Sequence, residues 1–223
     1  AKMLKLPRKI KQEIKLMKDK NMIAVDTYNK IAQEYDKEFG NDYSDTPYVD
    51  KFLNYLEGKK VLDIGCGVGN LTKYIMDKGF NVEGIDLSKE MLNIAKQKYN
   101  DIKFYEMNMK EITLRKKYDG IMLAYSLFHL TKKEVIEVLP KYYELLNSNG
   151  KILLILQYGQ GERIIDEPLK EGLKIFINYY SQDEIIEILR NNSFKILYTD
   201  LKKSESEFEL GNDKLVIICQ KTN

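Results

Sequence analysis

The segment from Lys60 to Asp86 constrains the fold more than any other part of the chain. It opens with a short apolar run typical of a buried strand, passes through closely spaced glycines and a helical pattern, and ends in a second apolar run. Asp86 stands at the end of that second run. Ligands of open α/β sheets bind beyond the carboxyl ends of the strands, and a carboxylate placed there can accept hydrogen bonds from two ribose hydroxyls. The segment therefore predicts half of a nucleotide-binding fold.

The spacing of the glycines distinguishes two kinds of nucleoside ligand. A dinucleotide fingerprint needs a glycine at its sixth position, where this chain has Asn70, and its third glycine comes early, at Gly69. Asp63 stands two residues before Gly65, where its charge would repel a pyrophosphate and attract an ammonium group. The loop therefore favours a nucleoside that carries an amino acid over one that carries a diphosphate.

Strand and helix patterns alternate from Lys60 to Gln157, which predicts crossover connections and a parallel sheet. This alternation stops after Gln157. Ser181 and Glu184 then match a capping box, which predicts a helix from there to about Asn191. Strands are expected at 60–64, 81–86, 102–106, 118–124, 150–157, 194–203 and 213–220. Helices are expected at 69–78, 88–98 and 131–146. The chain is long enough for one α/β domain.

The N-terminal part has a different pattern, which predicts a helical segment over residues 1–50 before an α/β domain over 51–223 with an insert at 157–180. Residues 2–20 read as a lysine-rich amphipathic helix, and Asp26 to Phe39 read as a second helix. Gly40 to Pro47 reads as an acidic loop. We therefore expect a single domain with an added helical segment at its N-terminal side.

Composition excludes several classes of function. The net charge of +2 gives no field that would demand nucleic acid. No apolar run reaches the roughly 18 residues that a membrane span needs, and no signal segment is apparent. The two cysteines, Cys66 and Cys219, do not have metal-ligand spacing, so no metal site is expected. A reduced, cytoplasmic location is the simplest expectation.

The order Asp63-x-Gly65-x-Gly67-x-Gly69 resembles the motif of class I S-adenosylmethionine-dependent methyltransferases, and the likeness extends over roughly residues 26–220. The resemblance implies an α/β, Rossmann-like, doubly wound and mostly parallel seven-stranded sheet. Its strand order would be 3-2-1-4-5-7-6, with the last strand antiparallel. S-adenosyl-L-methionine would be the cofactor and S-adenosyl-L-homocysteine the product.

The resemblance also assigns cofactor contacts. Gly65 and Gly67 would let the backbone pass close to the methionine part of the cofactor, and Asp63 would lie near its ammonium group. Asp86 would accept from the ribose hydroxyls. Asn108 stands where the family usually has an acid that accepts from the adenine amino group, and an amide can still accept there. Further contacts would come from Leu87, Met91, Met109 and Ala124. The resemblance also implies that the N-terminal helices form a lid, from which Tyr28 and Tyr35 would contact the cofactor.

The leading functional expectation is methyl transfer to an oxygen or nitrogen atom of a small-molecule acceptor, by a monomer or homodimer. The Asn/Asp-Pro-Pro-Tyr/Phe signature of many enzymes that methylate exocyclic amines is replaced by residues 124–127, Ala-Tyr-Ser-Leu. The alternative is an RNA or protein methyltransferase that uses the basic N-terminal helix. A non-catalytic cofactor-binding partner and a nicotinamide-dependent oxidoreductase are two further alternatives. His129 is the only histidine and is a candidate general base, although a packed structural histidine is the competing interpretation.

Overall fold

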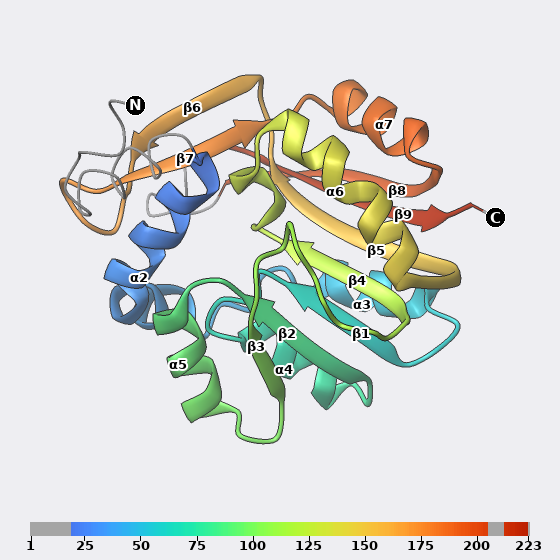
Figure 1. Cartoon of the computed structure of the whole chain (residues 1–223), viewed down its shortest axis with the longest axis horizontal. Coiled ribbons are helices and arrows are strands. Elements are labelled where there is room, and N and C mark those ends of the chain that lie inside the picture. The colour runs from blue at the N-terminus through green and yellow to red at the C-terminus, as the bar shows by residue number, and fades with distance from the viewer. Residues whose placement is uncertain (1–18, 205–211, 223) are drawn as a thin grey trace, which may run out of the picture.

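The structure is a computed structural model that describes residues 19–204 and 212–222, so the lysine-rich pattern at 2–20 lies almost wholly outside the described residues. Its centre is a seven-stranded sheet of order β3-β2-β1-β4-β5-β9-β8 (Figure 1). Strand β9 is antiparallel to both of its neighbours, and the other pairs are parallel. The strands are β1 (Lys60–Ile64), β2 (Asn81–Asp86), β3 (Lys103–Glu106), β4 (Tyr118–Ala124), β5 (Leu146–Gln157), β8 (Phe194–Lys202) and β9 (Lys214–Lys221). The expected fold class and strand order are confirmed.

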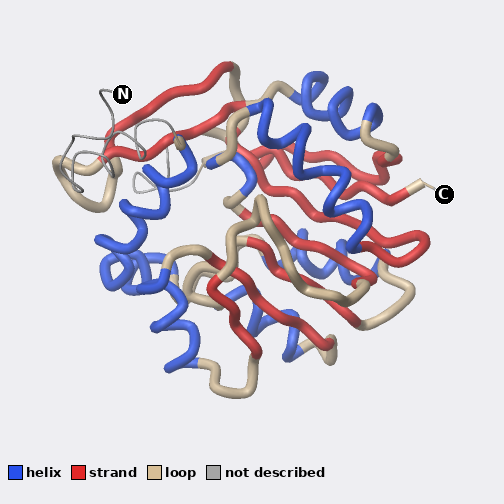
Figure 2. Tube along the Cα trace, in the orientation of Figure 1, coloured by secondary structure: helices blue, strands red, loops and turns tan. Residues whose placement is uncertain are grey.

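Helices cover both faces of the sheet. The apolar runs of the strands send alternate side chains to opposite faces, so that Val61 packs toward one helical layer and Leu62 toward the other. One layer consists of α3 (Thr46–Tyr55) and α4 (Asn70–Asp77), and the other of α6 (Lys132–Leu145) and α7 (Gln182–Asn191). Helix α5 (Lys89–Lys98) packs beside β2 and β3. Figure 2 shows the strands enclosed between these helices.

Helix α3 was not predicted from the sequence. It begins at Thr46, within the stretch expected to be a loop, and Pro47 stands in its first turn, where a missing N–H costs nothing. Val49, Phe52 and Leu53 form its buried face against the sheet. The expected boundary between residues 50 and 51 falls inside this helix.

Helix α2 (Lys20–Phe39) lies across the carboxyl ends of the central strands, between α5 and the insert (Figure 1). It begins six residues earlier than the sequence pattern indicated, because Asp19 caps it by accepting from the backbone N–H of Asn21. The Asn29 side-chain oxygen accepts from the Ser88 hydroxyl at 2.9 Å, which ties α2 to the start of α5. On its other side Thr27 donates to the backbone oxygen of Lys174 at 2.6 Å.

The insert after β5 is a hairpin of β6 (Gly161–Asp166) and β7 (Lys174–Tyr179), which form a separate two-stranded antiparallel sheet. Its tip reaches α2, where the Lys170 ammonium lies 2.6 Å from the Glu34 carboxylate. The hairpin and α2 therefore roof the carboxyl edge of the sheet together, and they do so from parts of the chain far apart in sequence.

Candidate functional site

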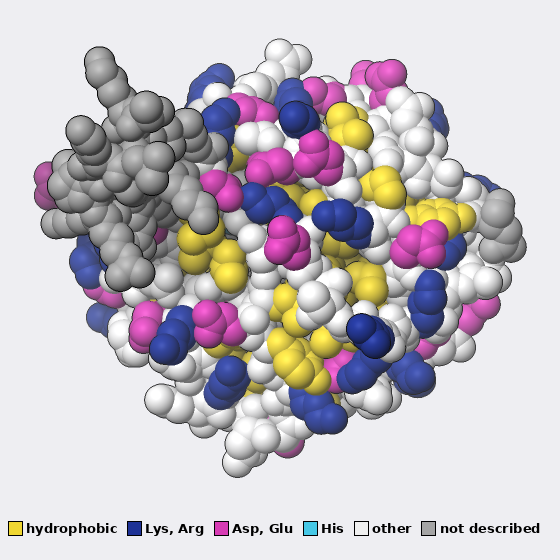
Figure 3. Space-filling model, viewed as in Figure 1, with side chains coloured by type: hydrophobic (Ala, Val, Ile, Leu, Met, Phe, Trp, Pro, Cys, Tyr) yellow, Lys and Arg dark blue, Asp and Glu magenta, His cyan; other side chains and the backbone are white. Residues whose placement is uncertain are grey.

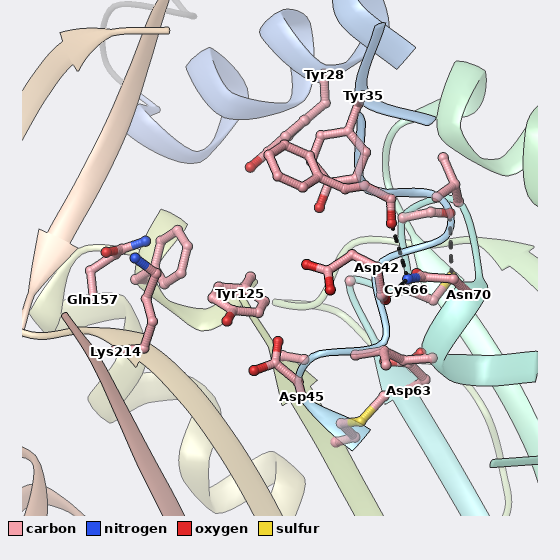
Figure 4. A pocket seen from close by; sticks show the side chains of 18 of the residues that line it. Tyr28, Tyr35, Asp42, Asp45, Asp63, Cys66, Asn70, Tyr125, Gln157 and Lys214 are labelled. Atoms are coloured by element: carbon pink, nitrogen blue, oxygen red, sulfur yellow. Dashed lines mark hydrogen bonds between the residues drawn. The ribbon is translucent and has the colours of Figure 1, made fainter. Parts of the chain in front are cut away.

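Two adjoining cavities lie at the carboxyl ends of β1, β2, β4 and β5, beneath α2. They measure about 990 and 640 Å³ with their open mouths included, a size suited to small-molecule ligands. The smaller, here the β2 cavity, is lined by Asp86, Leu87, Met91, Asn108, Met109 and His129. The larger, here the β5 cavity, is lined by Asp63, Gln157, Glu167, Leu169 and Lys214 (Figure 4). Both share Tyr28, Tyr35, Gly65, Gly67, Ala124 and Tyr125. The structure thus brings every predicted site residue to the walls of these two adjoining cavities.

The glycine loop after β1 forms the floor shared by the two cavities. The backbone N–H groups of Gly65 and Cys66 both donate to the Ile85 oxygen, so the loop is held against the end of β2. Gly65 and Gly67 have φ angles of +74° and +53°, which side-chain-bearing residues rarely adopt. A Cβ atom on Gly67 would meet nothing within 4 Å and would project into open space. This empty cradle is where a ligand can approach the backbone closely.

Asp86 joins the loop to the β2 cavity. One of its carboxylate oxygens accepts from the Gly67 N–H at 2.9 Å and the other from the Ser88 N–H at 2.8 Å. Burial raises the pKa of Asp86 above its usual value, and these backbone hydrogen bonds act in the opposite direction. Each carboxylate oxygen offers about two lone-pair sites, so the carboxylate can accept further hydrogen bonds from a diol.

Asp63 is the second acid of the loop and is only 2% exposed. It accepts from the Thr72 hydroxyl at 2.6 Å, which ties the end of β1 to α4. Burial raises the pKa of Asp63 to about 7, and the charge of Asp86 acts in the same direction. A nearby cation would oppose this effect and favour the ionised carboxylate.

Asp63 should make folding stability depend on pH. Its folded-state pKa is raised above the unfolded value, so the folded protein binds the proton more tightly and stability falls as pH rises from about 4 to 7, by at most about 1.4 kcal/mol per pH unit. Thermal unfolding of the wild type and of Asp63→Asn should show a smaller decline in the variant, because the amide does not titrate. Parallel curves for the two proteins would contradict this.

Tyr28 and His129 form a hydrogen-bonded pair at the edge of the β2 cavity. The Nδ1 atom of His129 lies 2.9 Å from the backbone oxygen of Phe176, which can only accept, so Nδ1 carries the proton. The Nε2 atom therefore accepts from the Tyr28 hydroxyl, 3.1 Å away. Burial lowers the pKa of His129 to about 4 and raises the pKa of Tyr28 well above its usual value. The imidazole is neutral, and its basic nitrogen, Nε2, already accepts a hydrogen bond from Tyr28.

Asn70, which departs from the dinucleotide fingerprint, has a structural role. Its side-chain amide donates to the backbone oxygens of Phe39 and Asp42, at 3.2 and 2.9 Å (Figure 4). The first residue of α4 thereby holds the loop that follows α2. Figure 4 shows Tyr28 and Tyr35 above the glycine loop, with Tyr125 between that loop and Gln157.

Sequence reasoning missed the polar residues of the β5 cavity. Gln157, Glu167 and Lys214 lie far from the glycine motif in sequence and meet its cavity only through the fold. Glu167 is 7% exposed and accepts from the Leu169 N–H at 3.2 Å, and burial raises its pKa. The position of Gln157 at the carboxyl end of a predicted strand was the one available signal, because that edge of the sheet carries the ligand.

The residues fit a nucleoside that carries an amino acid. A carboxylate at the end of β2 suits a ribose, the apolar side chains of Leu87, Met91 and Met109 suit a base, and the open cradle at Gly67 adjoins a buried acid. Among the described residues no group of three His, Cys, Asp or Glu side chains is placed to hold a metal ion, and no helix is long and apolar enough to cross a membrane. Fold and site together define a Rossmann-like protein of the methyltransferase class.

Comparison with known proteins identifies the family. The family model described as "Methyltransferase domain" matches residues 61–150. An uncharacterized methyltransferase of Bacillus mycoides (strain KBAB4) is 30% identical over 189 residues, which cover 78% of this chain and 88% of that protein. In two other relatives the match spans 66% and 53% of the relative's own length. The chain belongs to the methyltransferases, and its fold is that of class I S-adenosylmethionine-dependent enzymes.

Two solved structures share the fold at low sequence identity. Magnesium protoporphyrin IX methyltransferase from Synechocystis PCC 6803, with bound S-adenosylmethionine, gives a TM-score of 0.70 at 19% identity and covers 92% of this chain and 98% of that one. The 1,6-didemethyltoxoflavin-N1-methyltransferase of Burkholderia thailandensis, with bound 1,6-didemethyltoxoflavin and S-adenosylhomocysteine, gives a TM-score of 0.70 at 19% identity, covering 89% and 87%. These likenesses support the fold.

Proposed function

We propose that this methyltransferase transfers the methyl group of S-adenosyl-L-methionine to an oxygen or nitrogen atom of a small molecule bound in the β5 cavity. The observation that carries the proposal is the roof formed by α2 and the hairpin: Tyr28 and Tyr35 close one side of the shared space, and Glu167 and Leu169 line it from the hairpin tip. A roofed pocket of this size suits a metabolite better than a polymer. Both solved structures reported above are named for small-molecule acceptors.

In this proposal the β2 cavity holds the nucleoside part of the cofactor. Asp86 accepts from the ribose hydroxyls, while Leu87, Met91 and Met109 contact the adenine and Asn108 binds its edge. The methionine part follows the open cradle at Gly67 toward Asp63, whose ionised form pairs with the ammonium group. Ala124 lines both cavities, so it would lie beside the sulfonium, between the nucleoside and the acceptor.

When bound, S-adenosyl-L-methionine would supply a methyl group that the positive charge on its sulfur activates for transfer. The protein's part is to align the acceptor, exclude water and receive the acceptor's proton where one is lost. Glu167 is a buried carboxyl that lines the acceptor side of the cavity and can receive that proton.

Transfer of a labelled methyl group tests the proposal and its alternative together. The protein is incubated with methyl-labelled S-adenosylmethionine and either the low-molecular-weight or the macromolecular fraction of a bacterial extract. Label is expected in a product smaller than about 1 kDa. Label in RNA or protein would favour the alternative that relies on the basic N-terminal segment. Figure 3 shows Lys and Arg interspersed with Asp and Glu on the described part of one face, which is unlike a broad phosphate-binding surface.

We further propose that His129 positions Tyr28 and does not act as a general base. His129→Gln keeps a side-chain amide for hydrogen bonding, so methyl transfer should fall by less than about tenfold, whereas loss of a general base costs about 10²- to 10⁴-fold. Because the chain has one histidine, its ring signals in an NMR titration are unambiguous and should report a neutral ring from pH 8 to below pH 5. A pKa near 6.5 together with a hundredfold loss in a folded His129→Gln protein would assign it the catalytic role.

A further inference from the structure

Glu167 is a buried carboxylate at the hairpin tip that forms no ion pair with any described residue. It is 7% exposed and lines the β5 cavity. The Leu169 N–H donates to its Oε1 atom at 3.2 Å, whereas no described residue donates to Oε2. Oε2 still keeps accessible surface, because the fully buried side-chain atoms without a partner in this part of the chain are Gln157 Oε1 and Asn178 Oδ1. A buried carboxylate without a cation is costly, and a ligand that brings a positive charge would remove that cost.

Tyr28 and Tyr35 of α2 lie near this carboxylate. Burial is the largest cause of the raised pKa of both phenols, and the charge of Glu167 adds to it in each case, which requires the carboxylate to be close to them. Both rings line the cavity and stand at 89° to one another, with their centroids 5.7 Å apart (Figure 4). The faces of aromatic rings attract an ammonium group, so the rings and the carboxylate favour the same kind of ligand.

The other charged side chains of the cavity do not neutralise this end of it. Four carboxylates and one ammonium group line the β5 cavity. Asp45 is paired with Lys202 at 2.9 Å, and Asp63 is the acid that the proposed function assigns to the ammonium group of the cofactor. The ammonium group of the cavity, that of Lys214, donates to a backbone oxygen and lies across Tyr125 from Asp45 in Figure 4. The hairpin end of the cavity therefore keeps a negative charge, which repels an anionic acceptor and attracts a cationic one.

We propose that Glu167, Tyr28 and Tyr35 form a subsite for an ammonium group, so that the acceptor molecule is a primary or secondary amine that binds in its protonated form. Glu167 Oε2 accepts from an N–H of the ammonium group, and the tyrosine rings contact the cation. Among the described residues no three His, Cys, Asp or Glu side chains are placed to hold a metal ion, which favours an organic cation. The inference rests on the proposed function, because it names the acceptor class of the same pocket.

The same carboxylate has a second task in this subsite. An ammonium nitrogen has no lone pair, so it must lose one proton before it can accept a methyl group. Glu167 takes that proton, which turns the carboxylate into a neutral carboxylic acid and leaves the electron pair of the N–H bond on the nitrogen. Burial raises the pKa of Glu167, which makes this transfer less unfavourable.

Calorimetric binding of three matched probes to the protein saturated with S-adenosylhomocysteine tests the subsite. 2-Phenylethylamine carries an ammonium group, 2-phenylethanol a hydroxyl in the same place, and 3-phenylpropanoate a carboxylate. We expect the amine to bind about tenfold or more tightly than either of the others, because a charge-assisted hydrogen bond is roughly twice as strong as a neutral one. Glu167→Gln should abolish this preference. Glu171→Gln, the same change at an exposed glutamate of the same turn and outside the cavity, should preserve it.

The outcomes separate this inference from the proposed function. If the wild type binds S-adenosylhomocysteine but binds the amine no more tightly than the alcohol or the carboxylate, or does not bind the amine detectably, the ammonium subsite is wrong. A Glu167→Gln protein that binds S-adenosylhomocysteine normally and keeps the preference for the amine would also overturn it. Failure of the wild type to bind S-adenosylhomocysteine at all would instead contradict the proposed function.

Discussion

Asp86→Ala is expected to weaken S-adenosylhomocysteine binding by about 100-fold or more, which corresponds to about 2.7 kcal/mol. Hydrogen bonds to a charged group contribute about 1.5–3 kcal/mol each, and the proposed ribose contacts number two. The substitution also removes the acceptor of the Gly67 N–H, so the loop that cradles the methionine part loses its tie to β2. Isothermal titration calorimetry with S-adenosylhomocysteine measures the effect.

Two variants control this measurement. Asp86→Asn keeps the size of the side chain, but its amide N–H₂ must face the backbone N–H of either Gly67 or Ser88, so an intermediate loss is expected. Glu106→Ala removes an exposed acid at the register position opposite Asp86 on β3, outside both cavities, and should leave affinity unchanged. If Asp86→Ala bound as tightly as the wild type, the ribose would have to lie elsewhere.

The parts of the structure that could be predicted from the sequence are those determined by residues close together in the chain. The strands at 60–64, 81–86 and 118–124 have the expected bounds, because each is an apolar run long enough for one strand of a sheet buried on both faces. The motif residues are equally local, since the glycines and Asp86 belong to one strand–loop–helix–strand unit. Their convergence on one space follows from the parallel order of the strands.

What the sequence did not predict depends on contacts between distant segments. The hairpin β6–β7 has no regular alternation of apolar and polar residues, because its strands are exposed unequally and one of them packs against α2. Lys214 enters the β5 cavity only because β9 pairs antiparallel with β5 in one particular register. A slip of one residue would point it at the opposite face of the sheet. Such a residue is found from the fold and not from a motif.

Gly65→Ala and Gly67→Ala, two neighbouring changes of the same type, are expected to act in different ways. A Cβ atom on Gly65 would lie 2.3 Å from the Cβ of Ser126, and Ser126 is itself held by a 2.6 Å hydrogen bond to the Ile64 oxygen. Overpacking and a left-handed backbone should together cost about 2–5 kcal/mol of folding stability. For a chain of this size that lowers the melting temperature by roughly 5–15 °C. Differential scanning calorimetry measures the shift.

Gly67→Ala meets no atom within 4 Å, so its cost to folding is confined to backbone strain of about 1–2 kcal/mol. Its methyl group would instead occupy the cradle proposed for the cofactor, and S-adenosylhomocysteine affinity should fall at least tenfold. The double variant Gly65→Ala/Ser126→Gly removes the clashing Cβ and should be more stable than the sum of the single changes predicts. If Gly67→Ala bound S-adenosylhomocysteine as tightly as the wild type, the proposed position of the cofactor at Gly67 would be wrong. If the losses of stability in the double variant were additive, the contact with Ser126 would not explain why position 65 needs glycine.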